Sequence, residues 1–161
     1  IVGCYHVGTP AGVTLLDTMF GFIRSADGVV TSHPMSRTMN NGVNAAGDVA
    51  GPYFSPVSGR AEQSYLLRGG ELTWFGVPGS VATQAYDISS NGTIVGWHRT
   101  SLTGPLQFHG FVMRHGEISS IDVPGATDTR AFGVNASGAI VGYYRDAAGY
   151  HGFLLSQRGP E

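Results

Sequence analysis

Short apolar runs separated by glycine-rich turns recur along the whole chain. An Ile-Val-Gly phrase, or Val-Ala-Gly in one copy, begins at residues 1, 49, 94 and 140, so successive copies lie 48, 45 and 46 residues apart. A repeat at this nearly constant spacing is typical of proteins built from consecutive copies of one supersecondary unit. Apolar residues do not recur at helical spacing, and we therefore expect little or no helix.

Each repeat predicts four short strands joined by turns. The second strand carries the Ile-Val-Gly phrase, whose glycine we expect to permit the close approach of a neighbouring backbone or sheet. The third strand is exemplified by 110–113, and the fourth ends before the Val-Pro-Gly phrases at 77–79 and 123–125, because proline has no N–H for the ladder. The first strand ends before a hairpin turn in which a glycine is expected at positive φ, namely Gly47, Gly92 and Gly138.

These strands predict an all-β fold, a β-propeller built from four-stranded repeats of about 46 residues and incomplete at both ends. We interpret the chain as a single repeat domain with a partial blade at 1–35, blades at 36–80 and 81–126, and a partial blade at 127–161. A β-sandwich or β-solenoid is the alternative, but a sandwich has no reason to repeat its sequence at a fixed period. An incomplete blade leaves unpaired backbone groups at a sheet edge, so we expect a partner there, either the remainder of a longer chain or further copies in a homo-oligomer or polymer.

Composition excludes several classes of function. The chain has 161 residues, of which 12% are charged, and its nine basic residues are all Arg, so chemistry that needs a lysine is excluded. The net charge of −2 gives no basic surface for nucleic acid. No apolar run is long enough to predict a membrane span. The single cysteine, Cys4, is interpreted as a structural thiol, with a bridge between chains or a reactive role as the alternatives.

Aromatic residues and histidines at repeated positions are the candidate ligand-binding residues. Aromatic rings stack on sugars, but the same pattern also describes packing between repeats. Repeated histidines could converge on a metal, but the first two repeats have Phe20 and Gln63 in place of the histidine, so the sequence predicts no metal site, no cofactor and no catalytic residue. The candidates are Tyr53, Trp97, Tyr143, Tyr144, His109 and His151.

Two longer segments carry a family resemblance. The run 134–144 followed by 149–155, and the phrases at 108–111 and 121–126, closely resemble the bacterial extracellular repeat known as the HAF family. The resemblance extends over nearly the whole chain, strongly in 83–157 and more loosely in 1–80. It implies a secreted or surface-exposed protein with propeller-like repeats, and it implies no enzymatic activity.

The function predicted from these patterns is non-enzymatic. We expect an extracellular or cell-surface β-repeat protein used for binding, for surface structure or for self-assembly through open sheet edges. Lectin-like binding of a glycan by repeated aromatic pockets is the first alternative. The second alternative is a propeller hydrolase or lyase that uses Asp122, Asp128, His109 or His151.

Overall fold

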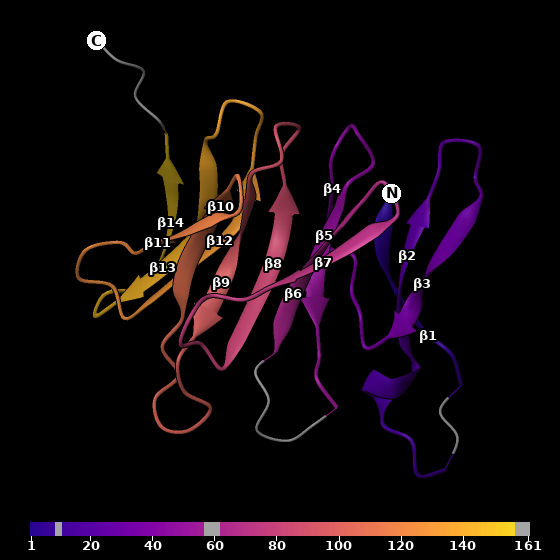
Figure 1. Cartoon of the computed structure of the whole chain (residues 1–161). Coiled ribbons are helices and arrows are strands. Elements are labelled where there is room, and N and C mark those ends of the chain that lie inside the picture. The colour runs from indigo at the N-terminus through magenta and orange to yellow at the C-terminus, as the bar shows by residue number, and fades with distance from the viewer. Residues whose placement is uncertain (9–10, 57–61, 157–161) are drawn as a thin grey trace.

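Four antiparallel sheets follow one another along the chain in the computed structural model, which describes residues 1–8, 11–56 and 62–156 (Figure 1). The prediction of an all-β fold is confirmed, and the described residues contain no helix beyond one 3-10 turn, η1 (Leu15–Thr18). The predicted end of the last repeat, 157–161, lies outside the described residues. No helix among the described residues is long and apolar enough to cross a membrane.

Each sheet is a meander in which neighbours in sequence are neighbours in space. Sheet A contains β1 (Val2–His6), β2 (Met19–Arg24) and β3 (Val30–Ser36). Sheet B contains β4 (Gly42–Val43), β5 (Val49–Tyr53), β6 (Gln63–Arg68) and β7 (Glu71–Phe75). Sheet C contains β8 (Ala82–Ile88), β9 (Ile94–Arg99), β10 (His109–Arg114) and β11 (Glu117–Ile121). Sheet D contains β12 (Asp128–Val134), β13 (Ile140–Asp146) and β14 (Gly149–Leu155).

Apolar side chains pack the sheets face against face. One cluster joins Ala50 and Leu66 of sheet B to Ile94 and Phe111 of sheet C. A second cluster joins the opposite side of sheet C to sheet D, through Val95, Val112, Ala131, Val134 and Ile140. We call the side of a sheet that is turned toward the next sheet in sequence its forward face, and the other side its rear face. Because side chains alternate along a strand, Ile94 lies on the rear face of sheet C and Val95 on its forward face.

The recurring glycine of the second strand is required by close approach, as predicted. A Cβ added to Gly96 would overlap the carbonyl oxygen of Gln84 in the neighbouring strand and would stand 2.8 Å from the ring of Phe111. Gly142 has the same surroundings, the carbonyl of Arg130 and the ring of Phe153. The hairpin glycines also behave as predicted, since Gly47, Gly92 and Gly138 have φ values of 84°, 81° and 81°.

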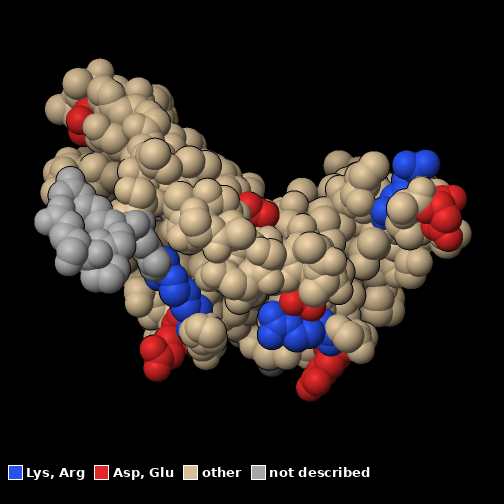
Figure 2. All heavy atoms as spheres, turned by 90° about the horizontal axis from the view of Figure 1, so that it is seen from above, with Lys and Arg blue, Asp and Glu red and all other residues tan. Residues whose placement is uncertain are grey.

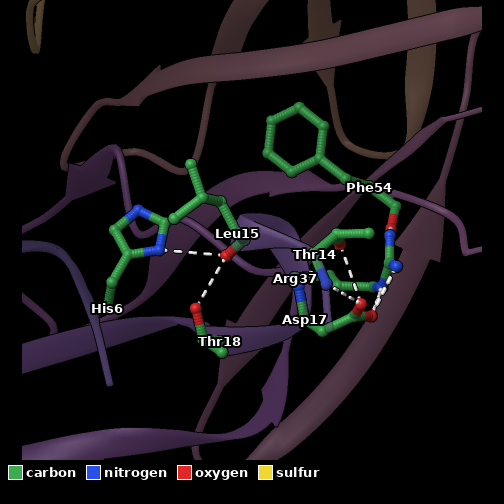
Figure 3. A network of polar contacts seen from close by, with 7 residues as sticks. All are labelled: His6, Thr14, Leu15, Asp17, Thr18, Arg37 and Phe54. Atoms are coloured by element: carbon green, nitrogen blue, oxygen red, sulfur yellow. Dashed lines mark hydrogen bonds and ion pairs between the residues drawn. The ribbon is translucent and has the colours of Figure 1, made fainter. Parts of the chain in front are cut away.

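Sheets A and B are joined by a polar clamp around Arg37 (Figure 3). Arg37 donates from Nε to Asp17 Oδ1 at 2.7 Å and from a terminal nitrogen to the carbonyl of Phe54 at 3.4 Å. Asp17 in turn accepts from the backbone N–H and the hydroxyl of Thr14, which caps η1. The clamp therefore ties the loop before β2 to the end of β5.

The stacked sheets give the molecule a curved outline. Sheets A and D lie at opposite ends of the stack (Figure 1), and seen from above the outline has a hollow on one side (Figure 2). The two end sheets therefore do not meet within one chain.

Candidate functional site

The residues that follow the recurring glycine form two rows on opposite sides of the stack. The first residue after the glycine lies on the forward face, because it shares the side of Val95. The second lies on the rear face. Register therefore makes Trp97 and Tyr143 equivalent forward residues, whereas Tyr53, His98 and Tyr144 are equivalent rear residues. The four candidate aromatic residues thus do not form one repeated pocket.

Trp97 is occupied by packing between sheets C and D. Its side chain is buried, and the ring of Phe108 meets it edge-on at 4.8 Å between centroids. Arg130 of sheet D places its guanidinium 3.5 Å from the centroid of Phe108 and 5.5 Å from that of Trp97. Asp128 fixes the guanidinium through two hydrogen bonds of 3.1 Å. Trp97 consequently offers no open ring face to a ligand in this structure.

Tyr143 lies on the forward face of sheet D, where no sheet follows among the described residues. Its ring is near those of Phe132, at 5.6 Å, and Tyr150, at 5.5 Å. Two aliphatic side chains beside it are open to solvent, Val141 with 48% of its surface exposed and Leu154 with 69%. The forward face of sheet D therefore carries an apolar patch, which we define by Val141, Tyr143, Tyr150 and Leu154. The guanidinium groups of Arg130 and Arg145 lie beside the two tyrosine rings.

The equivalent residues of sheet C show what such a face packs against. Val95 and Val112 of sheet C occupy the positions of Val141 and Leu154 in sheet D. In each sheet, the two residues lie opposite each other on the second and third strands. Val95 is 0% exposed and Val112 is 4% exposed, since sheet D covers them. The same positions thus change from buried to exposed between one sheet and the next.

The rear row pairs each ring with a second ring of the same sheet. Tyr144 stacks on His151 at 5.0 Å, and His98 lies 5.3 Å from His109. Tyr53 meets Trp74 at 5.1 Å. The candidate histidines His109 and His151 thus lie in different sheets and do not converge. Within the described part of the chain, no three His, Cys, Asp or Glu side chains are grouped so that they could hold a metal ion.

Both candidate histidines face a carboxylate, but different ones. His109 Nδ1 lies 3.1 Å from Asp122, which follows β11, and His151 Nε2 lies 3.1 Å from Asp146, which ends β13. Hydrogen bonds from the backbone N–H of Ala148 and from His151 lower the pKa of Asp146. These pairs hold strand ends and turns in place.

A pocket of about 350 Å³ lies beside His109, between sheets C and D. It brings together Asp122 and Asp128, the two carboxylates considered for acid and base chemistry. Asp128 is nevertheless buried and held by Arg130, and Asp122 faces His109. The arrangement therefore gives no supporting observation for a hydrolase or lyase.

Sequence reasoning missed two features of this region. His98 is buried, its Nδ1 lies 2.8 Å from Ser80 Oγ, and burial lowers its pKa. Arg130 closes the stack over Trp97 and Phe108, although Gln84 stands at its position in sheet C. Neither residue recurs in the repeat, so a search for repeated positions passes over both.

Comparison with known proteins adds no relative. No protein-family model, no curated protein and no solved structure matches the chain.

Proposed function

We propose that this chain is a non-enzymatic extracellular β-repeat module that assembles by stacking its end sheets against those of further copies. The observation that supports it is the forward face of sheet D. Val141 and Leu154 are 48% and 69% exposed there, whereas their equivalents in sheet C are covered by the next sheet. Removing such aliphatic side chains from water contributes roughly 1.5 to 3 kcal/mol for each one fully buried.

The rear face of sheet A supplies the matching surface. Ile1 is 72% exposed and Tyr5 is 37% exposed, while Ile94 and His98, their equivalents in sheet C, are both buried. Phe22 faces Gly3 as Phe111 faces Gly96, so it too occupies a position that packs against a preceding sheet. The chain thus carries the two different halves of one sheet–sheet interface at its opposite ends.

Two different halves predict a head-to-tail contact. The forward face of one copy meets the rear face of the next, and such a contact closes into a ring if the rotation permits and otherwise extends into a filament. The curvature of the stack (Figure 2) favours the ring, which is the β-propeller arrangement proposed for the complete assembly. The resemblance of 83–157 to the HAF repeats supports an extracellular or cell-surface location.

A complementation experiment tests this proposal. One variant carries Val141→Glu and Leu154→Asp on the forward face, and a second carries Tyr5→Glu on the rear face. Each variant alone is expected to sediment as a monomer with an unchanged circular dichroism spectrum. Their mixture should form a dimer, because each then supplies the face that the other has lost.

The matched control is Leu102→Asp, which changes an exposed leucine, 53% accessible, in the loop after β9. This variant is expected to associate like the unaltered chain. Failure of the two face variants to combine, or dissociation by Leu102→Asp to the same extent, would overturn the head-to-tail arrangement.

A further inference from the structure

Two similar grooves lie at the end of the sheets where the third strand turns into the fourth. Groove BC, of about 380 Å³, lies between sheets B and C and is lined by Leu66, Arg68, Thr73, Phe75, Asn91 and His115 among others. Groove CD, of about 230 Å³, lies between sheets C and D and is lined by Asn91, Thr93, Arg114, His115, Ser137 and Gly138. The grooves share Asn91 and His115, so they are neighbours along one surface.

The repeat extends to the residues that line the grooves. Arg68 and Arg114 are the last residues of β6 and β10, and each lies opposite the first residue of the following strand. The other wall comes from the hairpin turn of the next sheet, Asn91-Gly92 in groove BC and Ser137-Gly138 in groove CD. An arginine at the end of the third strand and a polar hairpin turn of the next sheet therefore recur in both grooves, which suits a ligand that is itself a chain of repeating units.

Hydrogen-bond donors line part of each groove. Arg68 uses Nε to pair with Asp48 at 3.0 Å, but its side chain remains 56% exposed. Neither of its terminal nitrogens makes a hydrogen bond within the described part of the chain. Arg114 makes no ion pair among the described residues. His115 is exposed between the two grooves. Guanidinium groups bind carboxylates through paired, charge-assisted hydrogen bonds.

His115 stands in a backbone conformation that disfavours most side chains. Its φ is 52°, in the left-handed region, and the equivalent turn residue in sheet B is Gly69 with a φ of 57°. Histidine at such a position carries a small conformational cost that glycine avoids. The imidazole lies where the two grooves meet, and a role in binding a ligand there explains why the chain has histidine instead of glycine.

We propose that grooves BC and CD together form a binding site for an acidic polysaccharide, whose uronate carboxylates pair with Arg68 and Arg114 and whose hydroxyl groups meet Asn91, His115 and Ser137. The apolar floor of groove BC, formed by Leu66, Phe75 and Met113, packs against one face of a sugar ring. The proposal does not depend on assembly of the chain, because both grooves lie within one copy.

Calorimetric titration with trigalacturonate is the direct test, with neutral cellotriose and sodium sulfate as comparison ligands. Trigalacturonate is expected to bind, and Arg114→Gln is expected to weaken it about tenfold, as loss of a charge-assisted pair does. Glu117→Gln should strengthen binding, because Glu117 lies opposite Arg114 and repels a carboxylate. Added salt should weaken binding by screening.

Two further variants complete the test, one in the shared wall of the grooves and one control outside them. His115→Gly places the residue of the equivalent turn in sheet B, so it should keep the fold and lose a few-fold in affinity. Arg145→Gln removes an arginine that lies beside Tyr150, away from both grooves, and should leave affinity unchanged. The proposal is overturned by absence of binding at millimolar trigalacturonate, by equal binding of cellotriose or sulfate, or by an Arg145→Gln loss that matches Arg114→Gln.

Discussion

The glycine of the Ile-Val-Gly phrase explains at the scale of one residue why the repeat is visible in the sequence. The preceding segment of backbone passes so close to the second strand that no side chain fits at Gly51, Gly96 or Gly142. Each of these glycines has a carbonyl oxygen of the neighbouring segment where a Cβ would stand. The phrase recurs because the same approach recurs in successive sheets.

Replacing this glycine is expected to be costly even by alanine. Gly96→Ala should destabilise the protein by about 3 kcal/mol or more, because a backbone carbonyl and the ring of Phe111 must both move. Gly8→Ala is the matched control, since no atom of the described residues lies within 4 Å of a Cβ there, and it should change stability by less than about 0.5 kcal/mol. Urea unfolding measures both, and equal effects of the two substitutions would contradict the close-approach account.

Two buried histidines make stability depend on pH. Burial lowers the pKa of His33 and of His98 below the ordinary value of 6.5, and the nearby His109 lowers that of His98 further. The unfolded chain therefore binds protons at a higher pH than the folded chain. Stability should be complete above about pH 7 and should fall as the pH drops below 6.5 toward the lowered folded values.

The variant His98→Tyr isolates one of these contributions. Tyrosine is the residue at the equivalent positions 5, 53 and 144, so the substitution follows the chain's own alternative. Urea midpoints at pH 7.5 and pH 5 should differ less for the variant than for the unaltered protein. The pKa of Asp17 is lowered from 3.8, chiefly by its hydrogen bond with the side chain of Thr14. Protonation of this carboxylate therefore affects stability only below about pH 3.8, outside the range compared here. An unchanged pH dependence in His98→Tyr would count against a role for His98.

At the scale of the element, strands and hairpins were predictable because their determinants are local. Alternating apolar residues and a glycine at positive φ define each hairpin within about ten residues. The Arg37 clamp was not predictable, because Asp17 and Phe54, its partners, are remote in sequence and belong to one junction only. Arg130 escaped prediction for the same reason, since its partner Phe108 lies outside the repeated strands.

The clamp leads to a prediction for sheet A. Arg37 has a φ of 64°, so Arg37→Asn keeps a residue type that tolerates this conformation while it removes the contacts to Asp17 and Phe54. Amide hydrogen exchange in β1–β3 should accelerate by about tenfold or more, because local opening of sheet A becomes easier. Exchange in β9 and β10 serves as the internal control. A uniform acceleration over all four sheets would show that Arg37 supports global stability instead.

At the scale of the whole molecule, the period of the sequence predicted consecutive sheets but not which of their faces remain open. Val95 and Val141 belong to the same phrase and are indistinguishable by pattern, yet one is buried and the other is half exposed. The difference arises from what lies beyond each sheet in space. The aromatic candidates differ in the same way. Sheet D packs on the forward face of sheet C, which carries Trp97, whereas no sheet among the described residues packs on the forward face that carries Tyr143.

The absolute mass of the particle formed by the unaltered chain tests the central claim most directly. Static light scattering after gel filtration, over a range of loading concentrations, gives this mass independently of shape. Assembly through the end sheets predicts a particle mass that is a defined or growing multiple of 16.9 kDa, because open forward and rear faces attract each other. A folded particle of 16.9 kDa at every concentration would contradict assembly through the end sheets.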